Sequence, residues 1–315
     1  MATYLVTGGA GFIGSNIVKE LLNRGETVRV LDNFSTGKRE NINGYKTSSH
    51  FAVFEGDLRS FHIVRDAVKG VEFILHQGAL PSVPRSINDP ITSNDVNILG
   101  TLNILEAAKE FGVHRVVYAS SSSVYGNTEI SPKVEELPVQ PLSPYSLSKY
   151  TGERYCQIYF HLYGLETVCL RYFNVFGPNQ DPSSQYSAVI PKFIKIMRQG
   201  ISPVIYGDGT QSRDFTYVAN NVEANLLACT SKDAAGQVLN IACGKSFTLL
   251  NLVDLINRIL GKDIHPKFEQ TRSGDVKHSL AGINKACQLL GYHVIIDFEE
   301  GIKKTIDFLS NTSFR

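Results

Sequence analysis

Thr7-Gly8-Gly9-Ala10-Gly11-Phe12-Ile13-Gly14 is the stretch of this 315-residue sequence that decides its fold. It follows a short apolar run, Tyr4-Leu5-Val6, and precedes a segment with helical spacing that continues through Leu22. Glycines at positions 8, 11 and 14 let the backbone approach a pyrophosphate, whose charge the following helix N-terminus favours. Such glycines can also serve packing alone, but a strand before and a helix after are what a dinucleotide turn requires. We therefore expect the turn to bind a dinucleotide through Gly8, Gly11, Phe12, Ile13 and Gly14.

An acidic residue ends the second predicted strand. That strand covers residues 27–31, and Asp32 follows it directly. At this place in a dinucleotide-binding unit, a carboxylate bonds the ribose 2′-hydroxyl and repels a 2′-phosphate. The sequence therefore predicts NAD rather than NADP as the cofactor, with Asp32 and its neighbour Asn33 among the residues that bind it.

Two later turns and one helix supply further cofactor candidates. Asp57-Leu58 follows a third predicted strand, where Asp57 can either cap the next helix or contact the adenine. Gln77-Gly78-Ala79 follows a fourth strand, and its small residues leave room for a dinucleotide to pass. Asn97 opens a predicted helix over residues 97–111, where a cap or a buried hydrogen-bonding role competes with cofactor binding.

Short apolar strands alternate with helical segments through the first half of the chain. Further strands are expected over residues 51–54, 73–75, 116–119 and 167–171, with helices between them. Alternation of this kind implies an α/β fold built on a Rossmann-type, doubly wound parallel sheet. The glycine turn would then lie at the carboxyl end of the first strand of that sheet.

The regular alternation of strands and helices ends after Asn174. Residues 177–182 form a loop rich in glycine and proline, and the last third of the chain predicts a smaller, mostly helical lobe. A strand over residues 238–242 can return to the main sheet. We expect an NAD-binding Rossmann domain over residues 1–173, with returning segments near 214–243. The smaller mixed α/β lobe over residues 174–315 would bind the substrate.

Composition argues against several classes of protein. The net charge is +1, and no basic cluster of the kind that binds nucleic acid is present. No apolar run reaches the ~18 residues of a membrane span, and residues 1–6 have neither the basic lead nor the cleavage pattern of a signal peptide. The five cysteines are scattered and form no CxxC or zinc spacing. We therefore expect a cytoplasmic protein without a metal, a nucleic-acid partner or a membrane anchor.

A serine run and a tyrosine–lysine pair suggest proton-transfer chemistry. Ser120 to Ser123 precedes a segment in which Tyr145 and Lys149, four residues apart, share one face of a predicted helix. At about 4 Å and an effective dielectric of about 20, an ammonium attracts a phenolate by about 4 kcal/mol, enough to lower a tyrosine pKa from about 10 to about 7. Such a tyrosine is a general base for a hydroxyl proton. Alone, the same pattern also fits an ordinary amphipathic helix.

Together these motifs resemble one family. The glycine turn, Asp32, the serine run and the tyrosine–lysine pair stand in the order and register of the extended short-chain dehydrogenase/reductases. The resemblance continues in residues 171–177, 207–215 and 272–276, so it covers nearly the whole chain. It implies NAD, hydride transfer at the 4-position of a nucleotide sugar, and a homodimer that packs helices 94–111 and 145–163 of each subunit together.

The serine segment distinguishes branches of that family. Sugar-nucleotide 4,6-dehydratases and UDP-glucuronate decarboxylases carry an acidic residue in it, and elimination of water needs an acid to protonate the departing hydroxyl. Residues 119–126 hold no carboxylate here and resemble the UDP-hexose 4-epimerases. Segments 82–86, 142–145 and 181–192 resemble the branch that accepts N-acetylated sugars. At Ser279, a tyrosine is typical of enzymes restricted to non-acetylated hexoses, so a serine leaves room for an acetamido group.

The resemblance also assigns site residues. It makes Ser121, Tyr145 and Lys149 catalytic, and it places Tyr145, Lys149 and Tyr172 against the cofactor. Arg213 would bind phosphate as a bidentate fork together with Arg272, although a surface ion pair is the ordinary alternative for each. The other residues expected to contact the UDP-sugar are Ser82, Arg85, Ser121, Ser122, Ser123, Asn174, Ala188, Val189, Lys192, Tyr206, Asp275 and Ser279.

The expectation is an NAD-dependent UDP-sugar 4-epimerase that interconverts UDP-GlcNAc and UDP-GalNAc through a 4-keto sugar, with UDP-glucose and UDP-galactose as further candidates. Three alternatives stay open. One is a 4-epimerase for UDP-glucose or UDP-glucuronate, because Arg85 could meet a carboxylate. The others are a nucleotide-sugar reductase and a non-catalytic NAD-binding regulator, although a regulator has no need for Ser121, Tyr145 and Lys149 together.

Overall fold

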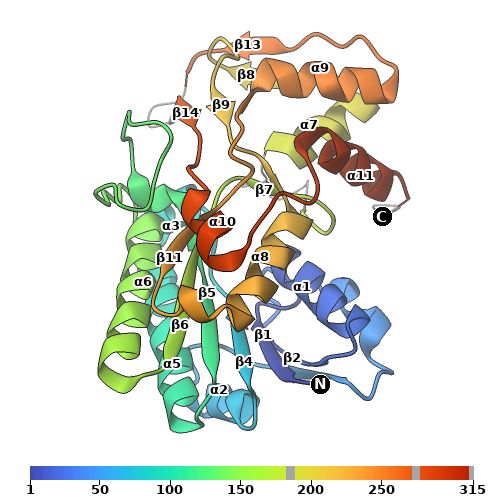
Figure 1. Ribbon diagram of the computed structural model, residues 1–315. Helices are drawn as coiled ribbons and strands as arrows, with labels where there is room; N and C mark the ends of the chain where they lie inside the picture. The colour runs from blue at the N-terminus through green and yellow to red at the C-terminus, as the bar shows by residue number, and fades with distance from the viewer. Residues whose placement is uncertain (182–188, 272–276, 312–315) are drawn as a thin grey trace.

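The computed structural model describes residues 1–181, 189–271 and 277–311. Its centre is a seven-stranded sheet in the order β11-β6-β5-β4-β1-β2-β3, with every pairing parallel (Figure 1). The predicted Rossmann-type α/β fold is therefore confirmed. The strands are β1 (Thr3–Thr7), β2 (Thr27–Asp32), β3 (Phe51–Glu55), β4 (Phe73–His76), β5 (Arg115–Ser121), β6 (Glu166–Tyr172) and β11 (Val238–Ile241).

The direction in which the chain builds the sheet reverses beside β1. From β1 the chain adds β2 and then β3 on one side, and it returns to place β4, β5 and β6 on the other. In sheets of this kind, ligands bind in the crevice at the carboxyl ends of the strands where the order reverses. The glycine turn and the turn after β4 both lie at that point.

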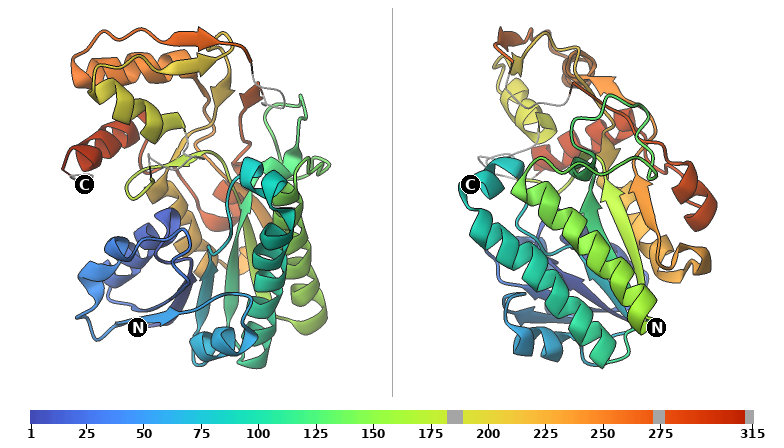
Figure 2. Two further views of the ribbon diagram at one scale, coloured as in Figure 1. Left: turned by 180° about the vertical axis from the view of Figure 1, so that it is seen from behind. Right: turned by 90° about the vertical axis from the view of Figure 1, so that its left-hand side faces the viewer.

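Two helical layers cover the sheet, as the two views of Figure 2 show. Successive side chains of a strand point to opposite faces, so Leu5 packs into one apolar cluster and Val6 into the other. Because both faces are covered, the strands are apolar almost throughout. One layer holds α1 (Phe12–Asn23) and α8 (Val218–Thr230), and the other holds α2 (Phe61–Val68), α5 (Gly100–Glu110) and α6 (Pro144–Tyr163).

The helix expected over 97–111 begins differently in the structure. Two short helices, α3 (Val83–Asn88) and α4 (Pro90–Asn94), lead into a π-helical turn over Asp95–Leu99, and only then does α5 begin. Asn97 therefore lies inside the π turn and does not cap a helix. A π turn shifts the side chains that follow it around the helix axis, and it often marks a functional region.

Helix α6, which carries the tyrosine–lysine pair, has strong end signals. Ser143 and Ser146 form a reciprocal capping box at its start, and Pro144 occupies its first turn. Gly164 ends it in the left-handed conformation, with φ 68°. These caps place Tyr145 in the first turn of a 20-residue helix that packs against β5 and β6.

The smaller lobe combines helices with short strands, as the expected mixed α/β lobe requires. Its helices are α7 (Val189–Arg198), α9 (Leu249–Leu260), α10 (Asn284–Leu290) and α11 (Phe298–Asn311). Its strand sets are β8 (Val204–Tyr206) with β13 (Lys267–Glu269), and β9 (Ser212–Arg213) between β12 (Phe247–Thr248) and β14 (His278–Ser279). A further pair joins β7 (Val175–Phe176) to β10 (Thr216–Tyr217).

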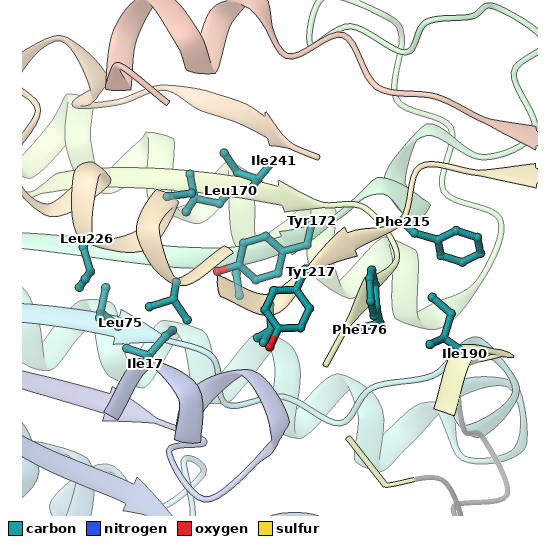
Figure 3. Close-up of a cluster of buried hydrophobic side chains, with 14 of the residues drawn as sticks. Ile17, Leu75, Leu170, Tyr172, Phe176, Ile190, Phe215, Tyr217, Leu226 and Ile241 are labelled. Atoms are coloured by element: carbon teal, nitrogen blue, oxygen red, sulfur yellow. The ribbon is translucent and has the colours of Figure 1, made fainter. Parts of the chain in front are cut away.

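One continuous apolar core joins the sheet to the smaller lobe (Figure 3). Phe176 packs edge-on against Tyr217, with ring centroids 5.7 Å apart, and against Phe298 at 6.0 Å. Leu170 and Ile241 of the main sheet belong to the same buried cluster. The two parts are therefore held together by packing, and a site between them has well-placed walls.

Across the described residues, the structure contains no helix whose length and apolarity would let it cross a bilayer. In the same part of the chain, no group of three or more histidine, cysteine or acidic side chains could hold a metal ion. All five cysteines are free thiols, of which Cys156, Cys169 and Cys229 are buried.

Candidate active site

A cleft lies at the carboxyl ends of β1, β2, β4 and β5. Most of the residues expected to bind the cofactor line it, although they come from six separate segments of the chain. They are Gly8, Gly11, Phe12, Ile13, Gly14, Asp32, Asn33, Asp57, Leu58, Gln77, Gly78, Ala79, Tyr145, Lys149 and Tyr172.

The glycine turn forms the floor of this cleft through its backbone. Gly8 has φ 64°, and a Cβ there would lie 2.8 Å from the Cα of Gly78. A Cβ on Gly14 would lie 2.2 Å from the carbonyl oxygen of Gly8, so the helix could not approach the strand as closely. Bare backbone at a helix N-terminus is a cradle that suits a pyrophosphate, and the site therefore fits a dinucleotide.

Asp32 lies at the edge of the cleft, where two backbone amides orient its carboxylate. The Ala10 and Phe34 N–H groups donate to it over 2.9 Å and 2.8 Å. Burial raises the pKa of Asp32, and these two hydrogen bonds oppose the rise. The carboxylate can still accept a ribose hydroxyl, because each oxygen has a second lone pair.

Polar side chains on both sides of the cleft are hydrogen-bonded to other protein groups. Asn33 donates to Asp57 over 2.9 Å, and Arg59 forms a fork with the same carboxylate, which lowers the pKa of Asp57 to about 2. On the other side, Gln77 accepts from the Tyr172 hydroxyl at 3.2 Å and donates to Asn225 at 3.0 Å. Asp57 is therefore a fixed anion at the cleft wall.

Asn97 does not line the cleft, in contrast to its expected place among the cofactor residues. Its amide oxygen accepts from the Leu80 N–H at 2.8 Å, and its amide nitrogen donates to the Leu80 carbonyl and to the Ser148 hydroxyl. Both ends of the side chain are occupied by protein groups. It ties the turn after β4 to helix α6 and so holds the cleft wall in place.

Tyr145 lines the cleft, and Ser121 follows the lining residue Ser120. The Ser121 side chain forms a hydrogen bond with the Tyr145 phenol, and the Tyr145 N–H donates to the Ser86 hydroxyl over 3.0 Å. The serine reaches this position because it ends β5, while the tyrosine opens α6. The structure thus brings together two residues that are 24 positions apart in the sequence.

The expected lowering of the tyrosine pKa by the lysine is wrong for the protein alone. Burial raises the pKa of Tyr145, and only the hydrogen bond with Ser121 opposes it. The Lys149 ammonium donates to the Ala119 carbonyl over 2.8 Å. Burial also lowers the pKa of Lys149, to about 8. Desolvation penalises both charged forms here, and the sequence pattern cannot reveal it.

A second cleft lies within the smaller lobe, among β7, α7, β8, β9 and the start of α9. Five residues that were expected to contact the UDP-sugar line it: Asn174, Val189, Lys192, Tyr206 and Arg213. Its other walls are apolar, from Phe176, Phe193 and Phe215 among others. The Arg213 guanidinium donates to the carbonyls of Ser212 and Lys277, so its place at the rim is defined. A flat apolar slot with a cation beside it suits a nucleobase followed by phosphate.

The remaining predicted substrate residues that the structure describes lie on α3, after β5 and on β14. Ser82 caps α3 with φ 93°, and Arg85 follows it in that helix. Ser122 and Ser123 continue the chain from Ser121, and the Ser123 hydroxyl is buried without a hydrogen-bond partner among the described residues. Ser279 is buried on β14, paired with Arg213 of the second cleft. Three other predicted residues, Ala188, Arg272 and Asp275, lie outside the described residues.

Sequence reasoning missed a buried polar group behind the catalytic candidates. Glu153 and Arg171 form an ion pair at 2.8 Å with side chains that are 1% and 4% exposed. The Ser120 hydroxyl donates to Glu153 over 2.5 Å. The signal was present in the sequence, because Glu153 lies one further helical turn beyond Lys149 on the same face.

Comparisons with known proteins agree with this geometry. Residues 4–242 match the model of the NAD dependent epimerase/dehydratase family. The solved structure of UDP-N-acetylglucosamine 4-epimerase from Methanobrevibacter ruminantium, in complex with UDP-N-acetylmuramic acid, is 40% identical, covers 98% of each chain and superposes with a TM-score of 0.94.

Relatives named for other sugars are similar too. The UDP-glucose 4-epimerase of Mycolicibacterium smegmatis is 36% identical over 98% of this chain and 99% of its own length. The UDP-glucuronate 4-epimerase of Thermodesulfobacterium geofontis is 35% identical over 98% and 96%. Similarity at this level therefore distinguishes the fold and family, but not the sugar.

Proposed function

The chain belongs to the NAD-dependent epimerase/dehydratase family, and from that premise we propose that it is a UDP-sugar 4-epimerase acting on UDP-GlcNAc and UDP-GalNAc. One observation carries the proposal. Tyr145 lines the dinucleotide cleft and forms a pair with Ser121, and residues 119–126 around that serine hold no carboxylate. This arrangement can move a proton at a hydroxyl, but it holds no acid for eliminating water.

The proton steps follow from the two hydroxyl groups. Tyr145 takes the proton from the sugar 4-hydroxyl and later returns it, while Ser121 orients the same oxygen. Burial raises the pKa of Tyr145 in the protein alone, which favours the protonated phenol that forms in the first step and opposes the phenolate that the first step requires. NAD held by the residues of the dinucleotide cleft would supply a reversible hydride acceptor for the 4-carbon. Inversion requires the 4-keto sugar to present its opposite face before the hydride returns.

Lys149 supplies positive charge close to these groups. Its ammonium is held by the Ala119 carbonyl and lies 5.1 Å from the centre of the Tyr118 ring. A cation in this position stabilises negative charge that develops on the phenol oxygen when a proton leaves it. The lysine must be protonated to do so, which connects turnover to its pKa of about 8.

The second cleft supports UDP as the part of the substrate by which the protein binds it. Asn174 and Arg213 lie at the end nearest β9, and Val189 and Tyr206 line the slot. We propose that the slot takes uracil and that Arg213 takes the diphosphate. The sugar would then lie between the two clefts, beside Ser279 and the unpartnered Ser123 hydroxyl.

The choice of an N-acetylated sugar rests on Ser279. This residue is buried on β14 next to Arg213, where a larger side chain would occupy space beside the sugar. UDP-glucose and UDP-glucuronate 4-epimerisation remain rivals, and so does a net nucleotide-sugar reductase, which would consume reduced cofactor in proportion to product. Absorbance at 340 nm during turnover separates a reductase from an epimerase.

The deciding experiment supplies UDP-GlcNAc, UDP-glucose and UDP-glucuronate separately and follows the 4-epimer by NMR. We expect the largest kcat/KM for UDP-GlcNAc. In Ser279→Tyr we expect at least a ~100-fold loss for UDP-GlcNAc with UDP-glucose turnover retained, because a wall that cannot move costs several kcal/mol. Equal turnover of UDP-GlcNAc by both proteins would contradict the choice of sugar.

We also propose a homodimer formed through α5 and α6. Leu147, Ile158 and Leu162 lie along one side of α6 and are 52%, 41% and 70% exposed. Ile91, 74% exposed, precedes the neighbouring α5. Leu162→Glu should lower the dimer fraction in sedimentation analysis, whereas Phe268→Glu, at another exposed apolar site on β13, should not. A monomeric wild-type protein would contradict the proposal.

A further inference from the structure

A buried carboxylate lies directly behind the proposed catalytic residues. Glu153 is on α6, four residues after Lys149, and it is 1% exposed. It accepts the Ser120 hydroxyl at 2.5 Å and two Arg171 N–H groups at 2.8 Å each. These contacts join α6 to β5 and β6, the neighbouring strands that Figure 1 shows beneath it.

The ion pair holds both ends of the segment that contains the proposed catalytic serine. At one end, the Ser120 hydroxyl donates to Glu153. At the other, the Arg171 guanidinium stacks over the Tyr125 ring, 4.7 Å from its centre. Ser121 lies between Ser120 and Tyr125 in the sequence. The contacts of the Glu153–Arg171 pair with those two residues therefore hold the Ser121 hydroxyl against Tyr145.

Glu153 also acts on the charge of Lys149. Burial lowers the pKa of Lys149 to about 8, and the Cys156 and Glu153 side chains act in the opposite direction. The other titratable groups around the ammonium are Tyr145, His76 and Tyr118. Burial keeps His76 neutral, with a pKa lowered to about 3, and the pKa of Tyr118 is raised. Among these neighbours, Glu153 is therefore the one carboxylate in the part of the chain that the structure describes.

The energetics of the pair favour a role beyond stability. Removing two charges from water costs several kcal/mol per ion, and an apolar pair of equal volume often stabilises a fold as well or better. The Arg171 Nη1 group has no hydrogen-bond partner among the described residues, so the pair is not even fully satisfied. An ion pair of this kind makes directional hydrogen bonds, so it can fix the positions of neighbouring groups in a way that an apolar pair cannot.

We propose that Glu153 is a positioning residue for this enzyme: through Ser120 and Arg171 it seats Ser121 against Tyr145, and its charge keeps Lys149 protonated. The inference rests on the proposed function for its catalytic meaning. The position of Ser121 and the protonation of Lys149 can both be measured without turnover.

The test uses Glu153→Gln, which keeps the shape of the side chain and removes its charge. Loss of that charge destabilises the ammonium, so the pKa of Lys149 falls. We expect its titration, followed by NMR of labelled lysine, to move at least half a pH unit lower. The alkaline limb of kcat should move by the same amount, and kcat at pH 7 should fall at least ~10-fold while KM changes less than ~3-fold.

Glu166→Gln is the matched control. Glu166 pairs with Arg115 at the opposite ends of the same strands, β5 and β6, with an N···O distance of 2.5 Å. Its loss should lower the melting temperature but leave the Lys149 titration and the alkaline limb of kcat unchanged. A purely structural role for Glu153 predicts that both variants behave like Glu166→Gln.

Two further variants cover the other outcomes. Ser120→Ala removes the contact to the serine segment without changing any charge, so kcat should fall while the alkaline limb stays in place. If Glu153→Gln does not fold, Glu153→Asp keeps the charge but shortens the reach, and it should give the result of Ser120→Ala.

An unchanged Lys149 titration in folded Glu153→Gln, or wild-type kcat in Ser120→Ala and Glu153→Asp, overturns the proposal. Failure of the wild-type protein to epimerise any UDP-sugar would count against the proposed function alone.

Discussion

The two clefts of this protein are built by different means. The dinucleotide cleft is made largely of backbone: glycines at 8, 11, 14 and 78 and the carboxyl ends of parallel strands. The second cleft is made of side chains brought from β7, α7, β8, β9 and α9, which are separated by up to 75 residues between Asn174 and Leu249. The first tolerates almost no change of shape, whereas the second can change ligand by exchanging single side chains. This difference agrees with the finding that similar proteins of one family are named for different sugars.

The largest expected effect is the loss of turnover in Tyr145→Phe. Tyr145→Phe removes the hydroxyl that carries the proton, and loss of a general base costs about 10² to 10⁴ in rate. The variant should still bind NAD and UDP, because neither cleft changes shape. Turnover is measured by NMR, and binding by calorimetry. Turnover within ~3-fold of wild type would show that Tyr145 is not the base.

Gly14→Ala tests the claim that the dinucleotide cleft cannot change shape. The new Cβ would lie 2.2 Å from the Gly8 carbonyl oxygen, so helix and strand must separate. Overpacking of this kind costs about 1–3 kcal/mol, and we expect NAD affinity to fall up to ~100-fold. Gly44→Ala, at a site with open space around it, is the control and should bind NAD like wild type. Equal affinity in both variants would contradict a backbone-defined cleft.

Arg213→Lys probes the second cleft. The charge is kept, but the planar fork that can hold a diphosphate bidentately is lost. A hydrogen bond to a charged group contributes about 1.5–3 kcal/mol, so UDP should bind at least ~10-fold more weakly. NAD affinity should not change, since Arg213 is not part of the first cleft. Weaker binding of NAD as well would mean that the clefts are not independent.

The clefts should also respond differently to pH. Lys149 has a pKa of about 8, below its ordinary value, so its ammonium is present below that pH and is lost above it. We expect kcat to fall about tenfold per pH unit above pH ~8. UDP affinity should hold through pH 9, because arginine stays protonated. A pH–rate profile set beside calorimetry of UDP at each pH measures both; a flat profile to pH 10 would argue against the need for a charged lysine.

The smallest effect concerns a surface contact between the two halves of the site. Lys38, beside the dinucleotide cleft, pairs with Asp181 at 2.9 Å, and their side chains are 48% and 32% exposed. Exposed pairs contribute about 0–1 kcal/mol, so Lys38→Ala should change the melting temperature by only a few degrees and leave kcat unaltered. The small change should vanish at high salt. A large loss of activity would indicate that this pair closes the site.

Much of the first cleft could be predicted from the chain because its geometry is local. A glycine turn between a strand and a helix specifies its own shape, and Asp32 follows the next strand at a fixed distance. Asn97 could not be placed in this way, since its partners Leu80 and Ser148 come from other segments and a π turn intervenes. Most of the short strands expected in the smaller lobe could not be located individually, because strands of two or three residues carry too little periodicity to detect.

By itself, the sequence determined the alternation of strands and helices, the dinucleotide turn and the spacing of Tyr145 from Lys149, since each of these depends on residues close together in the chain. Only the tertiary structure decided the protonation of those two side chains. Burial raises the pKa of Tyr145 and lowers that of Lys149, opposite in both cases to what charge attraction alone would do. Desolvation depends on everything that packs around a group, from β5 to the Glu153–Arg171 pair, and no linear spacing records it.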